Sequence, residues 1–128
     1  MKTILLVDDD VDLIEVYRLA IGQYGHQVQS ANSAEEARQL LKTVTVDAVV
    51  LDVMMERMDS GFELAQELRQ KRPELPVILL TGMHKVLPQS LRFEPSEGFL
   101  PATKLLNKPI DPAVLAQEVD ALLVGRAG

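Results

Sequence analysis

Three short, unbroken apolar runs constrain the fold of this chain more than any other feature of its sequence. They cover residues 4–7, 48–51 and 77–80, and none of them contains a polar side chain. Continuous runs of this length are typical of strands in a parallel sheet that helices cover on both faces. Residues 26–30 alternate instead, with Val28 between two glutamines, and this pattern predicts a half-exposed strand at the edge of the sheet.

Amphipathic segments lie between these runs and predict helices. The first has a broad stripe of residues on one helix face, which comprises Val11, Leu13, Ile14, Tyr17, Arg18, Ala20 and Ile21. Polar caps mark where helices begin, and glycine or proline marks where they end. These signals are Gly25 after the first helix, Ser33 and Glu36 as a capping box, Pro73 after a third helix, and Asp111 with Pro112 before the last.

Strands and helices alternate along the chain, which predicts an α/β fold with a doubly wound parallel sheet. A weaker apolar segment at Leu105 and Leu106 makes a fifth strand. Because the edge strand is second in the chain, the flavodoxin-like order 2-1-3-4-5 with three α/β/α layers fits best. Residues 83–103 contain three prolines and predict an irregular fourth helix region. We expect one domain, residues 1–128, because this length suits a single core.

Composition excludes several classes of function. The net charge is −6 and the 13 basic residues form no stripe along the sequence, which argues against direct nucleic-acid binding. No apolar segment is long enough for a membrane span or a signal peptide, so we expect a soluble, cytoplasmic protein. The absence of cysteine excludes thiol catalysis. His26 and His84 are not accompanied by the residues of a metal or catalytic site and are interpreted as surface residues. The sequence leaves open whether the chain forms a homodimer.

Polar residues follow the predicted strands at the point where each strand ends. Asp8 and Asp9 follow the first, Asp52 the third and Thr81 the fourth, and Lys108 would follow the fifth. The carboxyl ends of parallel strands line one crevice, where folds of this type bind their ligands. We therefore expect these five side chains to converge. Asp10 is interpreted differently, as the N-cap of the first helix.

Three carboxylates in one place repel one another unless positive charge is supplied. Oxygen ligands from Asp9, Asp52 and a backbone carbonyl, completed by water, suit Mg²⁺. A carboxylate can attack phosphorus, and Asp52 is the best nucleophile because the metal-binding pair comes from another strand. Mg²⁺, Lys108 and the Thr81 hydroxyl would hold the phosphoryl oxygens. The hypothesis requires the Asp52 carboxylate to lie near Asp8 and Asp9 and to be open to solvent.

The chain resembles, over essentially its whole length, the receiver domain of two-component response regulators. The matching motifs are ILLVDDD with Asp8 and Asp9, VVLDVMM with Asp52, ILLTG with Thr81, and NKP with Lys108. The resemblance implies that a histidine kinase or phosphotransfer protein donates a phosphoryl group to Asp52, and that the change switches a surface for an unknown effector. It implies Asp9, Asp52 and the Met54 carbonyl as Mg²⁺ ligands, with Asp8 acting through water. It implies no turnover of a free substrate.

The sequence departs from this family at three places. Glu56 replaces a usual proline, and the turn at residues 59–61 looks one residue longer, so we expect the loop beside Asp52 to differ. Leu105 stands where most members carry a tyrosine or phenylalanine that turns inward during switching. The stretch between Thr81 and Lys108 is longer than the family norm.

Two alternative functions remain at this point. ILLVDDDV also resembles the nucleophile motif of haloacid-dehalogenase-type phosphatases, which would make Asp8 the nucleophile of an enzyme. A receiver-like module that is not phosphorylated would instead use its altered loops as a constitutive partner surface. The site of labelling by a phosphoryl donor separates the three functions.

Overall fold

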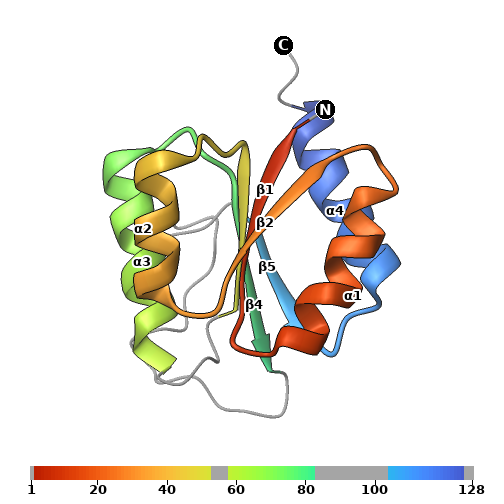
Figure 1. Cartoon of the computed structure of the whole chain (residues 1–128), viewed down its shortest axis with the longest axis horizontal. Helices are drawn as coiled ribbons and strands as arrows, with labels where there is room; N and C mark the ends of the chain where they lie inside the picture. The colour runs from red at the N-terminus through yellow and green to blue at the C-terminus, as the bar shows by residue number, and fades with distance from the viewer. Residues whose placement is uncertain (1, 53–57, 83–103, 126–128) are drawn as a thin grey trace.

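A computed structural model describes residues 2–52, 58–82 and 104–125 of the chain. Strands and helices alternate in it until β4 is followed directly by β5 among the described residues (Figure 1). The predictions for Met54, Glu56, His84 and residues 83–103 lie outside the described residues, as does the side chain of Leu105. The elements are β1 (Thr3–Val7), α1 (Val11–Gly22), β2 (Gln27–Ala31), α2 (Ala34–Thr43), β3 (Ala48–Asp52), α3 (Met58–Lys71), β4 (Val77–Gly82), β5 (Lys104–Lys108) and α4 (Pro112–Gly125).

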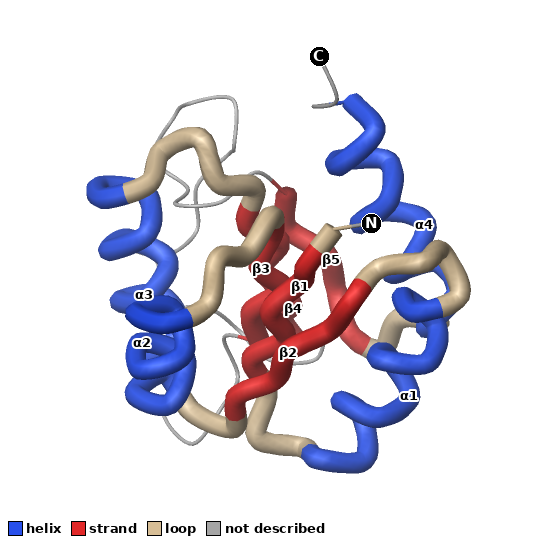
Figure 2. Tube along the Cα trace, turned by 45° about the horizontal axis from the view of Figure 1, so that its top comes forward, coloured by secondary structure: helices blue, strands red, loops and turns tan. Residues whose placement is uncertain are grey.

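The strands form one parallel sheet in the order β2-β1-β3-β4-β5. The sheet lies between two pairs of helices, with α2 and α3 on one face and α1 and α4 on the other (Figures 1 and 2). The register places Val7 opposite Leu51, and Asp52 opposite Leu80, so these strands end at the same edge. The predicted doubly wound α/β architecture is confirmed.

The apolar runs are buried because each faces two cores. Alternate side chains of a strand point to opposite faces. Leu5, Leu51 and Leu79 pack under α2 and α3, whereas Ile4 and Ile78 pack under α1 and α4. All five are completely buried. A continuous apolar run is therefore needed to fill both layers, which explains why these strands do not alternate in polarity.

The edge strand β2 is covered by an arginine. Its residues alternate between exposed and partly buried as far as Ser30, as expected for a strand with one wet face. Arg18 of α1 donates one hydrogen bond to the Val28 carbonyl at 2.6 Å and another to Ser30 Oγ at 2.9 Å. Arg18 thus satisfies an edge carbonyl that no neighbouring strand pairs.

The predicted helix starts are confirmed by their caps. Ser33 Oγ accepts the Glu36 N–H at 3.1 Å, while the Glu36 carboxylate accepts the Asn32 N–H at 2.8 Å, one residue before the cap. Asp10 Oδ1 accepts two N–H groups at the start of α1, and Asp111 Oδ1 accepts one at the start of α4. Side-chain oxygens therefore replace the missing helical acceptors at each of these ends.

Two predictions about helices were wrong. Residues 59–61 do not form a turn but the beginning of α3, where an acidic residue is favourable because the helix dipole is positive there. Val11 belongs to the predicted apolar stripe of α1, yet its side chain is 59% exposed. It is the first helical residue and lies beyond the end of β1, so the sheet does not cover it. Ile14 and Ile21 are buried as the stripe predicts.

His26 is not the surface residue that the sequence suggested. Its side chain is only 9% exposed, and its Nε2 lies 2.9 Å from Asp120 Oδ1. Its Nδ1 accepts the Lys2 N–H at 3.3 Å. The imidazole therefore links the beginning of the chain and the segment before β2 to α4. No local pattern predicts a contact between residues 94 positions apart.

Candidate functional site

Polar side chains lie at the carboxyl ends of four strands, at one edge of the sheet. Asp8 follows β1, Asp52 ends β3, and Thr81 lies near the end of β4 opposite Asn107. Lys108 ends β5 and lies opposite Gly82. The parallel register makes these ends coincide, so residues far apart in the sequence become neighbours.

The structure brings three carboxylates together at this edge. One carboxylate oxygen each from Asp8, Asp9 and Asp52 lies within 4.8 Å of the others. The Lys108 ammonium lies 3.1 Å from Asp52 Oδ2 and 3.3 Å from Asp8 Oδ2, and therefore bridges two of the acids. One cation facing three anions leaves this cluster net negative.

Burial distinguishes the three carboxylates. Asp8 and Asp52 are each 3% exposed, while Asp9 is exposed. The requirement that Asp52 be open to solvent is therefore not met. Lys108, whose side chain is 18% exposed, contacts the Asp52 carboxylate through their ion pair. A long lysine side chain can change rotamer without unfolding the sheet, so this contact with the carboxylate is able to open.

Burial and charge shift two pKa values in the cluster. Burial raises the pKa of Asp8 to about 6, and the nearby Asp52 charge adds to this, against the opposing effects of the Asp10 N–H and Lys108. For Lys108, burial lowers the pKa, but the charges of Asp52 and Asp8 outweigh it and raise the pKa above its usual value. Burial is thus the main cause of the Asp8 shift, whereas the neighbouring carboxylate charges cause the Lys108 shift.

Thr81 is buried beside this edge and has an unused hydroxyl. The residue is 4% exposed, and its Oγ1 has no hydrogen-bond partner among the described residues. A buried hydroxyl without a partner costs free energy of about 1–3 kcal/mol. Such a group suits a site that receives an oxygen-bearing ligand.

Two further residues next to the cluster were not predicted as part of it. Tyr17 of α1 is 2% exposed, and burial raises its pKa, as do the charges of Asp8 and Asp52. Asn32 donates a hydrogen bond to the Asp8 carbonyl at 3.4 Å. The apolar stripe identified Tyr17 only as a core residue, and no signal in the sequence identified Asn32. Asp10, by contrast, acts as the predicted cap, and its N–H is accepted by Asp8 Oδ1 at 2.9 Å.

The donor set fits a small divalent cation. Two oxygens bound to one Mg²⁺ at ~2.1 Å lie no more than about 4.2 Å apart. The three carboxylate oxygens lie within 4.8 Å of one another, so small side-chain movements would bring them within this span. All three ligands are oxygen atoms, which Mg²⁺ prefers and structural Zn²⁺ sites rarely use alone.

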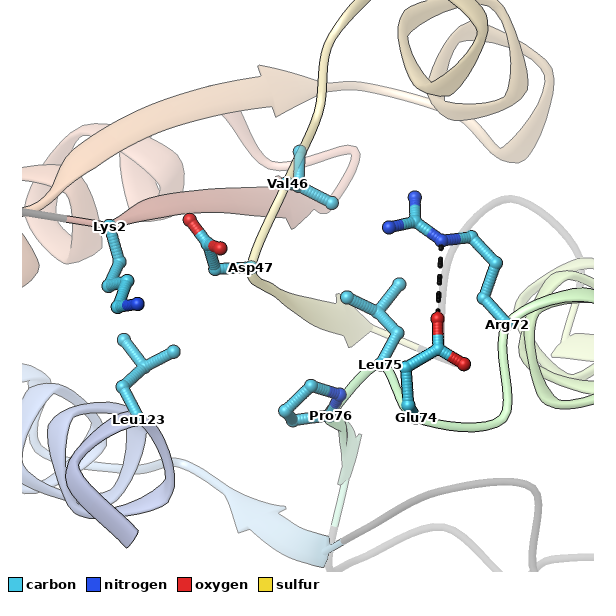
Figure 3. A pocket seen from close by; sticks show the side chains of 8 residues that line it. All are labelled: Lys2, Val46, Asp47, Arg72, Glu74, Leu75, Pro76 and Leu123. Atoms are coloured by element: carbon cyan, nitrogen blue, oxygen red, sulfur yellow. Dashed lines mark ion pairs between the residues drawn. The ribbon is translucent and has the colours of Figure 1, made fainter. Parts of the chain in front are cut away.

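The opposite edge of the sheet holds a hollow of about 220 Å³ at the start of β1, β3 and β4. Figure 3 shows Lys2 and Arg72 on opposite sides of it, with Arg72 beside Glu74. Asp47, the other acid, accepts the Thr3 N–H at 2.8 Å. Two cations and two carboxylates balance here, so this hollow does not gather charge of one sign.

A comparison with known protein families identifies the family of this chain. The model of the response regulator receiver domain matches residues 4–120. This chain belongs to that family. It is therefore a receiver domain of the two-component response regulators, whose members are signalling proteins rather than enzymes with a free substrate.

Curated relatives support the same family. The transcriptional regulatory protein GlrR of Escherichia coli (strain K12) is 34% identical over 120 residues, covering 94% of this receiver domain and 26% of GlrR. The alkaline phosphatase synthesis transcriptional regulatory protein PhoP of Bacillus subtilis (strain 168) is 31% identical over 122 residues, covering 95% and 48%. The receiver domain thus spans between a quarter and a half of the length of these two relatives.

Solved structures agree with the fold. The response regulator TrrA from Thermotoga maritima, in complex with Mg²⁺-BeF, has 30% identity and a TM-score of 0.75, covering 95% of this chain and 99% of TrrA. A CheY-like receiver domain protein from Methanospirillum hungatei JF-1 has 24% identity and a TM-score of 0.82, covering 98% of this chain and 95% of that protein, and it shares the fold. Within the described segments, none of the helices combines the length and apolar character needed to cross a membrane.

Proposed function

We propose that Asp52 is the phosphoacceptor of this receiver domain. The observation that carries the proposal is the position of its carboxylate, within 4.8 Å of the oxygens of Asp8 and Asp9 and 3.1 Å from the Lys108 ammonium. An Asp52 oxygen would attack phosphorus of a phosphohistidine on a histidine kinase or phosphotransfer protein. The new O–P bond forms as the N–P bond breaks, and the departing imidazole keeps the electron pair and takes a proton from solvent.

Asp9, Asp52 and the Met54 carbonyl would hold Mg²⁺, with Asp8 acting through water. When bound, Mg²⁺ supplies positive charge that neutralises the phosphoryl oxygens. Lys108 would leave its bridge between Asp8 and Asp52 and pair with one phosphoryl oxygen. The unpartnered Thr81 hydroxyl would donate a hydrogen bond to another. These groups also favour later transfer of the phosphoryl group to water, which ends the signal.

The phosphorylated state would change the surface offered to an effector. Two groups are expected to reorient, because Lys108 exchanges a carboxylate for a phosphoryl oxygen and Thr81 gains a partner. Four points stay predictions: the effector, a homodimer, the single-domain organisation over residues 1–128 and a cytoplasmic location.

One observation favours the alternative of a module that is not phosphorylated, namely the 3% exposure of Asp52. Incubation with acetyl phosphate and Mg²⁺, followed by trapping and mass-spectrometric mapping of the acyl phosphate, separates the two. We expect label on Asp52 and none on Asp52→Asn, because an amide is not an anionic nucleophile. Asp47→Asn changes a carboxylate at the opposite edge and should label normally. Absence of label on the parent, or label on Asp8, would contradict the proposal.

A further inference from the structure

A second feature of the receiver domain is a hollow between α2 and α3, away from the carboxylate cluster. It has a volume of about 250 Å³. Both helices end at the edge of the sheet opposite to Asp52, since α2 leads into the start of β3 and α3 into the start of β4. The hollow lies along their C-terminal halves and is lined by Arg38, Leu41, Lys42, Leu64, Glu67, Leu68, Lys71 and Arg72.

The floor of the hollow is apolar. Leu64 and Leu68 are 1% and 5% exposed and belong to the core under α2 and α3. Leu41 is partly buried and packs against the same core. A side chain that enters the hollow would therefore meet three leucines instead of water, which favours an apolar group.

The rim is cationic, although the chain as a whole carries a net charge of −6. Four cations and one carboxylate line the hollow. Arg38 is satisfied within the chain, because its Nε lies 2.9 Å from Glu67 Oε2 and its Nη2 lies 3.0 Å from Glu67 Oε1. That hydrogen-bonded pair, together with the charge of Lys71, holds the pKa of Glu67 below its usual value.

Of the remaining three cations, two form no ion pair among the described residues and the third forms a long one. Lys42 and Lys71 are exposed, and no carboxylate of the described residues lies within 4.0 Å of either ammonium. Arg72 Nε is 4.0 Å from Glu74 Oε1, the outer limit of an ion pair. Cations near helix C-termini also complement the helix dipole, but that effect does not require them to surround an apolar hollow.

We propose that this hollow binds an acidic segment of a partner protein, which inserts one apolar side chain against the three leucines and places carboxylates beside Lys42, Lys71 and Arg72. Charge complementarity supports an acidic partner, since it both attracts the segment and fixes its register. The hollow is smaller than the ~300–1,000 Å³ typical of small-molecule sites, so it suits a side-chain anchor. An apolar anchor in a pocket with a polar rim is the usual centre of a protein interface.

A titration of the full isotope-labelled chain, followed by amide chemical shifts, tests this site. The probe is a short peptide with one leucine between runs of glutamate. We expect saturable shifts in the C-terminal halves of α2 and α3. Replacement of the peptide leucine by serine, or of its glutamates by glutamine, should abolish them. Asp52→Asn should bind the peptide like the parent, which separates this proposal from the phosphoacceptor role.

Charge-removing variants locate the site more closely. Lys42→Gln combined with Lys71→Gln should weaken peptide binding by about tenfold. Arg69→Gln removes one positive charge from an exposed position of α3 that does not line the hollow, and it should bind as the parent does. Lys71→Gln alone removes the same single charge from the rim and should bind the peptide more weakly. Equal binding by Arg69→Gln and Lys71→Gln would overturn the proposal, as would no saturable shift at all. Shifts in the hollow that depend on protein concentration without peptide would also overturn it, since the occupant would be a second copy. Anionic vesicles are added as competitors. If they displace the peptide and cause the same amide shifts in α2 and α3, the surface binds lipid and the proposal is overturned.

Discussion

The two ends of the sheet handle charge in opposite ways. At the carboxyl edge, Asp8 and Asp52 are buried and share one cation, Lys108, so negative charge is left over. At the amino edge, Asp47 accepts a backbone N–H and the cations and carboxylates are equal in number. The balanced edge contributes to stability, whereas the unbalanced edge costs stability in the absence of ligands. Such a cost is expected where a protein is organised to bind a cation and an anionic group.

The largest expected effect is the loss of Lys108. Lys108→Met keeps most of the side-chain length but leaves two buried carboxylates without their shared cation. We expect a loss of about 2–3 kcal/mol in the free energy of unfolding at neutral pH without Mg²⁺, measured by urea denaturation. Lys104→Met, on the same strand, removes a more exposed ion pair with Glu118 and should cost much less. A similar loss of unfolding free energy for both variants would show that unbalanced negative charge does not destabilise the carboxyl edge.

Addition of Mg²⁺ should stabilise the parent, because the cation balances the excess negative charge of the carboxylates. When free Mg²⁺ exceeds its Kd about thirtyfold, mass action predicts about 2 kcal/mol of added stability. Thermal denaturation with and without the cation measures this. Asp9→Asn should lose most of the response, while Asp47→Asn, at the amino edge, should retain it. An equal response in Asp9→Asn would place the ion elsewhere.

Asp8→Asn should stabilise the chain without Mg²⁺ by about 1.5 kcal/mol at neutral pH, because it removes the cost of burying a charged carboxylate and, to a smaller extent, its repulsion with Asp52. The pKa of Asp8 is raised from 3.8 to about 6, so between these pH values the folded parent keeps a proton that the unfolded chain has lost. Parent stability therefore falls as pH rises through this window and stays lower above it. The advantage of Asp8→Asn should fade as pH is lowered through the same window. An advantage that does not depend on pH would indicate another cause.

The smallest expected effect is a loss of stability at the amino edge, where removal of a carboxylate should destabilise the chain and not stabilise it as Asp8→Asn does. Asp47→Ala removes the acceptor of the Thr3 N–H at the start of β1 and should cost about 1 kcal/mol. Because this edge binds no cation in our proposal, the loss should be the same with and without Mg²⁺. Denaturation of Asp47→Ala with and without Mg²⁺ checks this. A gain in stability would show that carboxylates are unfavourable at both edges of the sheet.

Much of the fold was predictable because its signals are local. Each buried strand is an unbroken apolar run, and each cap places a polar atom within a few residues of the N–H that it accepts. The candidate site residues were also identifiable, since Asp8, Asp52 and Thr81 directly follow an apolar run, and Asp9 and Lys108 lie one residue further on. Residues 59–61 were misjudged by comparison with the family turn, although Asp59 is compatible with the first turn of a helix.

By itself, the sequence determined the strands, most helix boundaries and the family, because hydrophobic periodicity and capping act over short distances along the chain. Only the tertiary structure decided that Lys108 bridges Asp8 and Asp52, that Asp52 is covered, and that His26 meets Asp120. These contacts join residues 56 to 100 positions apart. They depend on the order of the strands and on which helices share a face, and no pattern within one segment contains that information.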